Sequence, residues 1–156
     1  MKASVLKIAV MAFAVTLASC TKNSSSPSSS STSTTASFGA TIATTGGGTA
    51  YTFSTSNASL GANFLTITET ATGSSGYKMS IYVPTPVSAK TYTITTLGNG
   101  CYATVQNTSG QYWSSSSGTL TITSYSSSSV SGTFSFTASG SSAMTVSNGS
   151  FSNIGI

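Results

Sequence analysis

The stretch that decides the fold is residues 118–151, which read GTLTITSYSSSSVSGTFSFTASGSSAMTVSNGSF. Large apolar residues alternate with Thr, Ser or Gly in three segments separated by serine-rich runs: Leu120 and Ile122, then Val130, Phe134 and Phe136, then Met144 and Val146. This alternation is typical of strands with one buried and one solvated face. The stretch therefore predicts three sequential antiparallel strands.

The alternation changes phase once, near the end of this stretch. Val146 and Phe151 stand at positions of opposite parity, and Asn148-Gly149 lies between them. One extra residue in a strand restores the parity and bends the strand locally. We therefore expect a bulge or tight bend at Asn148-Gly149 that keeps Phe151 on the core side.

The same pattern continues toward the N-terminus as far as Phe38, and no window has a period near 3.6. The expected core positions are Phe38, Ala40 and Ile42, Tyr51 and Phe53, Leu65 and Ile67, Tyr77, Met79, Ile81 and Val83, Tyr92 and Ile94, and Cys101, Ala103 and Val105. Each of these groups shares one face of a short strand.

Turn residues separate these strands. Gly46-Gly47-Gly48 lies at one predicted turn, Pro84 and Pro86 end a strand by removing backbone donors, Gly98-Asn99-Gly100 has hairpin-turn chemistry, and a short QYW segment follows Gly110. Frequent turns without a helical crossover favour an all-β antiparallel β-sandwich of about 8–10 strands. A closed β-barrel of the same strands is the alternative.

The first 19 residues have the layout of a secretory signal peptide. Lys2 and Lys7 precede an apolar run, residues 8–17, that is shorter than the roughly 20 residues needed to span a bilayer. The run therefore predicts a cleaved leader. Leu17-Ala18-Ser19-Cys20 resembles the bacterial lipobox, which implies that Cys20 is acylated and becomes the first residue of the mature protein. The alternative is an ordinary secretory signal in which Cys20 is incidental.

Three parts follow from this interpretation: a signal peptide at 1–19, a lipidated cysteine with a Ser/Thr-rich tether at 20–37, and a single β domain at 38–156. Residues 21–37 read TKNSSSPSSSSTSTTAS. A segment with so few apolar side chains cannot offset the entropy cost of ordering itself. We therefore expect a flexible tether that carries the β domain on a membrane.

The C-terminal segments also resemble a known group of proteins. GTLTITSY at 118–125, VSGTFSFTA at 130–138 and MTVSNGSFSNI at 144–154, with AKTYTI at 89–94, are similar to small lipoproteins from Bacteroidota. The resemblance implies an all-β domain on a lipid anchor in the cell envelope, with the outer membrane as the expected location, and brings no known activity. Acidic residues that often direct surface export in that phylum are replaced by Thr21-Lys22-Asn23, so the leaflet stays open.

Charged groups are scarce enough to exclude several functional classes. After cleavage only Lys22, Lys78, Lys90 and Glu69 remain, so the formal charge falls from +4 to +2, three lysines minus one glutamate. Nucleic-acid binding needs clustered Lys and Arg and is therefore excluded. The chain has no His and no Asp, which removes Ser-His-Asp systems and paired carboxylates. We expect no enzyme activity, no metal site and no cofactor.

We expect the few remaining reactive groups to have structural and not catalytic roles. Lys78 and Lys90 stand beside turn residues, where we expect solvated side chains. Glu69 is expected to face water or to pair with a lysine. Cys101 shares the parity of Ala103 and Val105, so we expect a buried, inert thiol.

A nearly uncharged domain must bind through aromatic rings, hydroxyls and amides. Tyr82 and Tyr102 are opposite in parity to the core residues of their strands, and Tyr112-Trp113 follows Gly110. These four residues are the candidate ligand-binding platform, on which a sugar ring would stack; the alternative is that they fill the core. The leading hypothesis is a non-enzymatic envelope module that binds a protein or an envelope polymer or has a structural role. The alternative is a glycan-binding accessory lipoprotein that uses Tyr112 and Trp113 as its stacking surface. Thr-x-Thr runs are not expected to form an aligned hydroxyl array, because the chain has no repeat.

Overall fold

The computed structural model describes the backbone of residues 35–44, 47–71 and 76–156, and the side chains of all of these except 54–56 and 71. The predicted leader, Cys20, most of the predicted tether and Gly46 lie outside the described residues. No helix in the described part of the chain is long and apolar enough to cross a membrane.

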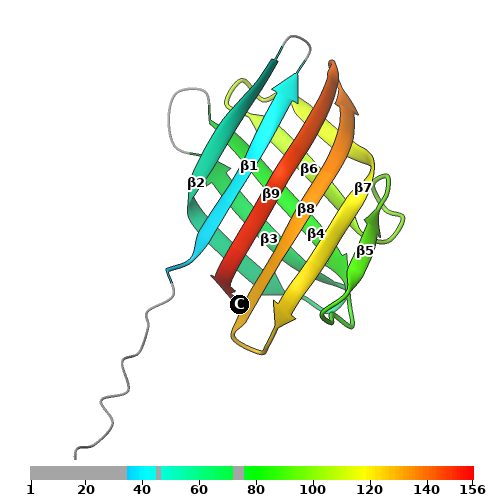
Figure 1. The fold of residues 1–156 in the computed structure, drawn as a ribbon. Coiled ribbons are helices and arrows are strands. Elements are labelled where there is room, and N and C mark those ends of the chain that lie inside the picture. Colours follow the sequence, from blue (N-terminus) through cyan, green and yellow to red (C-terminus); the bar gives the residue numbers. More distant parts are fainter. Residues whose placement is uncertain (1–34, 45–46, 72–75) are drawn as a thin grey trace, which may run out of the picture. The chain divides into compact units, whose positions relative to one another are not determined.

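The described residues form nine strands (Figure 1). Their bounds are β1 Ser37–Thr44, β2 Gly47–Leu60, β3 Phe64–Ala71, β4 Tyr77–Pro84, β5 Thr91–Ile94, β6 Tyr102–Asn107, β7 Tyr112–Tyr125, β8 Ser129–Gly140 and β9 Ala143–Gly155. Every pair of neighbouring strands among these is antiparallel. The predicted all-β antiparallel fold is therefore confirmed.

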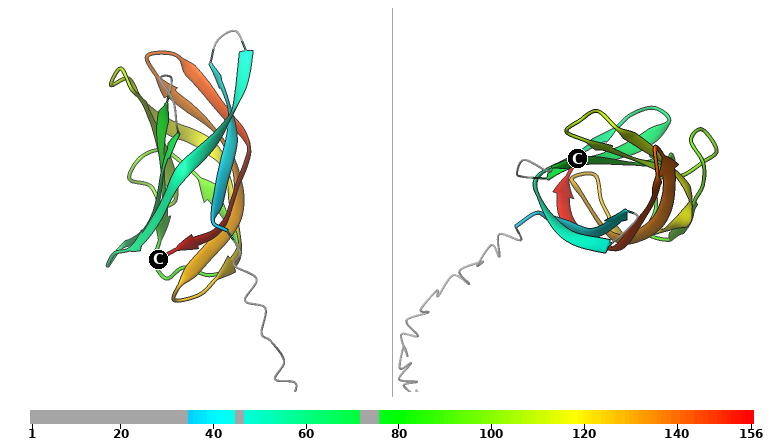
Figure 2. Two further views of the ribbon diagram at one scale, coloured as in Figure 1. Left: turned by 90° about the vertical axis from the view of Figure 1, so that its left-hand side faces the viewer. Right: turned by 90° about the horizontal axis from the view of Figure 1, so that it is seen from above.

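The strand pairing closes on itself. Neighbours follow the order β7-β6-β4-β3-β2-β1-β9-β8, and β8 pairs again with β7. This ring corresponds to the closed barrel expected as the alternative. One wall carries β1, β9, β8 and β7 and the other β3, β4 and β6, and the two walls face each other as the layers of a sandwich do (Figure 2).

The core fills the space between these walls. Alternate residues of the strands point inward, and the positions predicted from the alternation are buried except Tyr51 and Tyr77, which pack against the core half-buried. Phe38 lies at the centre of an aromatic group, with ring centroids 5.0 Å from Phe53, 5.2 Å from Phe134 and 6.1 Å from Phe151. The interior is thus packed with side chains, so a binding surface must lie on the outer face of the barrel.

The predicted bulge at Asn148-Gly149 is confirmed. Asn148 has a φ of 51°, and the β8–β9 register shifts between Phe134 and Phe136. Phe151 is consequently on the core side, only 2% exposed. Gly149, which follows Asn148 in the bulge, faces the ring of Phe134. A Cβ atom at Gly149 would lie 2.4 Å from the nearest carbon of that ring.

The predicted hairpin at Gly98-Asn99-Gly100 is not formed. The residues do make a loop, with φ of 86° at both Gly98 and Gly100, but β5 and β6 are both antiparallel to β7 and therefore run in the same direction. Strands that run in the same direction cannot be joined by a two-residue hairpin turn. The loop instead carries the chain past the irregular part of β7, from a position beside Gly118–Thr121 to one beside Tyr112–Ser114.

Candidate binding surface on the outer wall

Tyr82 and Tyr102 lie side by side on the outer face of the wall formed by β3, β4 and β6. They are opposite one another in the β4–β6 ladder, with ring centroids 4.4 Å apart and ring planes inclined by 16°. Both rings are half-buried. Their outward parity follows from the inward alternation of Ile81, Val83 and Ala103, so the structure brings together two of the four predicted residues.

Phe64 completes this group and was not predicted. Its ring stands edge-on to both tyrosines, with centroids 6.4 Å from Tyr82 and 5.7 Å from Tyr102. The signal was present in the sequence, because Phe64 has the opposite parity to Leu65 and Ile67. We call Phe64, Tyr82 and Tyr102 the aromatic cluster.

Tyr112 lies on the same outward face of the sheet as the aromatic cluster but outside it. Its neighbour across the β6–β7 ladder is Gln106, and its side chain is 48% exposed. Burial, followed by the neighbouring phenols of Tyr82 and Tyr112, raises the pKa of Tyr102. Tyr82 and Tyr102 stack on each other, which covers one face of each ring. Tyr112 is therefore the ring most accessible to a ligand.

The prediction that Trp113 belongs to an exposed platform is wrong. Its side chain is 2% exposed, its Nε1 donates a hydrogen bond to the Ser142 carbonyl at 3.1 Å, and Tyr77 packs against the ring with centroids 6.2 Å apart. Tyr112 and Trp113 of the QYW segment begin the 14-residue strand β7, and Gln111 immediately precedes it. Alternation along β7 therefore points Tyr112 outward and Trp113 inward.

Glu69 also departs from its expected position. It continues the inward row of Leu65 and Ile67, and its side chain is 1% exposed. The expectation that it faces water is therefore wrong, because its parity, and not its nearness to the strand end, decides its direction. Lys78 and Lys90 are exposed as expected, and the Lys90 Nζ lies 4.9 Å from the centroid of the Tyr92 ring.

Cys101 is buried as expected, with 4% of its surface exposed. Burial raises the pKa of its thiol to about 12. The thiolate is the reactive form of cysteine, so this burial suppresses nucleophilic chemistry near neutral pH. Within the described ranges there is no group of three or more His, Cys, Asp and Glu side chains that could hold a metal ion.

The outer face around the aromatic cluster is polar and carries an exposed cation, Lys78, which lies in the same cross-strand row as Gln106 and Tyr112. Thr68 and Ser80 form the adjacent outward row with Thr104, and the hydroxyl oxygens of Thr68 and Ser80 are 3.3 Å apart. Because Ser80 and Thr104 are each only 7% exposed, this row offers a ligand few accessible hydroxyls. Comparisons with family models, with curated proteins and with solved structures find no match to this chain.

Proposed function

We propose that this chain is a lipid-anchored, non-enzymatic binding module of a bacterial cell envelope. The lipobox-like Leu17-Ala18-Ser19-Cys20 carries the proposal of anchoring. Two or more acyl chains hold a protein at a membrane without further contacts, because each buried CH₂ contributes about 0.8 kcal/mol. The outer membrane is the proposed location.

The non-enzymatic part of the proposal rests on the chemistry of the chain. It has no His and no Asp, and its only Glu is buried inside the barrel. General acid–base catalysis commonly depends on such groups at a site that a substrate can reach. A packed interior and an outer face with few charged groups fit a binding role.

The anchor is tested by metabolic labelling with an alkyne analogue of palmitate. The full chain should take up the label, the Cys20→Ala variant should lose it, and the Cys101→Ala variant should keep it, because Cys101 is buried in the barrel. Label that persists in Cys20→Ala would refute the proposal.

A second candidate function is glycan binding at Tyr112 and the aromatic cluster. The observation that favours it is the half-exposed ring of Tyr112 on the same outward face of the sheet as Tyr102. An aromatic contact contributes about 0.5–1.5 kcal/mol beyond burial of its surface, which corresponds to roughly a twofold to tenfold change in affinity.

Affinity electrophoresis of the full chain in gels that contain soluble polysaccharides tests this candidate. Tyr112→Ala should weaken retardation about twofold to tenfold. Leu97→Ala, a change at a residue 54% exposed in the loop between β5 and β6, should leave it unchanged. Trp113 fluorescence is not a suitable reporter because the indole is buried. Equal retardation of both variants and the parent chain would eliminate this candidate.

A further inference from the structure

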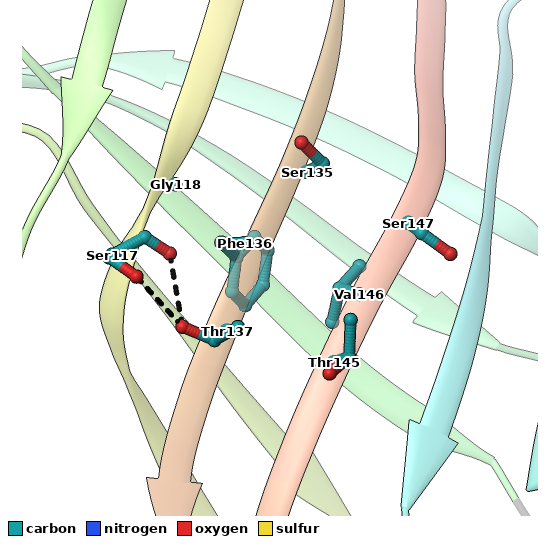
Figure 3. A pocket seen from close by; sticks show the side chains of 8 residues that line it. All are labelled: Ser117, Gly118, Ser135, Phe136, Thr137, Thr145, Val146 and Ser147. Atoms are coloured by element: carbon teal, nitrogen blue, oxygen red, sulfur yellow. Dashed lines mark hydrogen bonds between the residues drawn. The ribbon is translucent and has the colours of Figure 1, made fainter.

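Two adjoining troughs lie on the wall of the barrel that does not carry the aromatic cluster, on the outer face of β7, β8 and β9. The first has a volume of about 220 Å³, with a floor formed at Gly118, Phe136 and Val146 (Figure 3). The second has a volume of about 410 Å³, with a floor that includes Phe134 and Gly149. Ser135 lines both and forms the rib between them.

The strand register explains these troughs. Residues directly opposite each other form rows across the strands, and outward rows alternate with inward rows. Ser117, Thr137 and Thr145 form one outward row, and Thr121, Thr133 and Ser150 form another. The inward row of Gly118, Phe136 and Val146 leaves a channel beside the first. Hydroxyl rows therefore align without a sequence repeat, contrary to the expectation from sequence.

The troughs have hydroxyl rims and a partly apolar floor. In the first trough the hydroxyl oxygens of Ser117 and Thr137 are 2.9 Å apart (Figure 3). The second trough is also lined by Asn148, the exposed bulge residue, which has a side-chain amide. Hydroxyls and amides both donate and accept hydrogen bonds, as the hydroxyls of a sugar do.

We infer that these troughs bind a chain of uncharged polysaccharide. The wall formed by β1, β7, β8 and β9 has no charged side chain along any of these four described strands, so it offers no counter-charge to an ionic polymer. A protein partner is disfavoured, because interface cores are enriched in aromatic residues, Met and Arg and depleted in Ser. A rigid, flat crystal surface is disfavoured as the ligand, because the troughs make this wall uneven.

The inference does not depend on the anchor at Cys20 or on Tyr112, which lies on β7 at its junction with β6 and does not line either trough. Each neutral hydrogen bond contributes little on exchange with water. Many weak contacts along one polymer chain are therefore required, and a long polysaccharide should bind more tightly than its short fragments.

The test is affinity electrophoresis of the full chain in a polyoxyethylene detergent, which has no sugar headgroup. The probes are dextran, laminarin and hydroxyethylcellulose as uncharged polymers and polygalacturonate as a charged one. Ser135→Arg places a bulky side chain between the troughs, and we expect it to weaken retardation about tenfold. The matched control is Ser139→Arg, also exposed on β8 but outside both troughs, which should bind as the parent does.

Thr133→Val keeps the shape of the side chain and removes one rim hydroxyl, and it should weaken binding about threefold. This variant decides the outcome if Ser135→Arg fails to fold. Loss of binding in Ser135→Arg with retention in Ser139→Arg and Tyr112→Ala would support the inference. Loss in Tyr112→Ala alone would overturn it in favour of the aromatic site. Absence of retardation by every uncharged probe, or equal retardation by polygalacturonate, would also overturn it.

Discussion

At the scale of single residues, Ser115 joins strand β7 to strand β6 and to the residue that follows β5. Its side chain is 2% exposed, and its hydroxyl accepts a hydrogen bond from the Ala103 amide at 3.0 Å and donates one to the Thr95 carbonyl at 2.5 Å. The residue stands where the β7–β8 register shifts, between the part of β7 beside β6 and the part beside β5. The Ser115 hydroxyl thus provides hydrogen bonds to the backbone where the regular strand pairing is interrupted.

Ser115→Ala should therefore lower the free energy of unfolding by about 1–3 kcal/mol, because it leaves two backbone groups in the interior without this partner. Urea denaturation monitored by circular dichroism measures the change. Ser139→Ala, at an exposed position of β8, should change the value by less than about 0.5 kcal/mol. Equal stability of the two variants would contradict the role assigned to Ser115.

The buried thiol of Cys101 predicts a pH dependence of stability. Burial raises its pKa from 9.0 to about 12, so the neutral thiol of the fold contributes its full stabilisation below pH 9. That contribution is lost as the pH rises from 9 toward 12, at up to about 1.4 kcal/mol per pH unit. Cys101→Ala should lose less stability over this window. The tyrosines whose pKa is raised, Tyr77 and Tyr102, act in the same direction in both proteins and cancel in the comparison. Parallel curves would contradict the prediction.

At the scale of elements, the bulge in β9 sets the direction of the final residues. Gly149 permits it, because a Cβ atom there would lie 2.4 Å from the Phe134 ring. Gly149→Ala should therefore destabilise the protein by about 1–3 kcal/mol through overpacking. Gly155→Ala is the control in the same strand, since no atom beyond the neighbouring residues lies within 4 Å of the added carbon. Chemical denaturation of both variants measures the difference, and a tolerated Gly149→Ala would show that β9 can move away from Phe134.

Alternation predicted the strands well wherever apolar residues mark the inward face. It predicted the direction of Phe151 through the bulge, and that of Tyr82 and Tyr102 through parity. It failed for Trp113 because the next inward residue, Ser115, is polar, so the beginning of the long strand β7 has no apolar pattern.

Pairing between distant strands was less accessible from sequence. The turn residues 98–100 indicate a reversal of the chain, but whether two strands pair depends on neighbours remote in sequence. Here β7 takes both β5 and β6 along one side. The hydroxyl troughs were missed for the same reason, because their rows exist only once β7, β8 and β9 are in register.

At the scale of the whole barrel, closure predicts a single cooperative unfolding transition. Each strand in the ring of pairings has two neighbours within the ring, and β7 pairs with β5 as well. The buried residues form one core cluster across both walls. Opening either wall would expose the interior of the other. Trp113 provides a local probe, because it is buried and its neighbours across the ladders are Val105 and Gly140.

Urea curves followed by Trp113 fluorescence and by far-ultraviolet circular dichroism should therefore coincide, as expected for a two-state domain of this size. The fluorescence reports one region of the core, whereas the circular dichroism reports the whole sheet. Ser115→Ala should shift both curves by the same amount, since the destabilisation is shared by the entire ring. A fluorescence change at a lower urea concentration than the loss of sheet signal would mean that the junction of β6, β7 and β8 opens first, and that pairing around the ring does not make the barrel one cooperative unit.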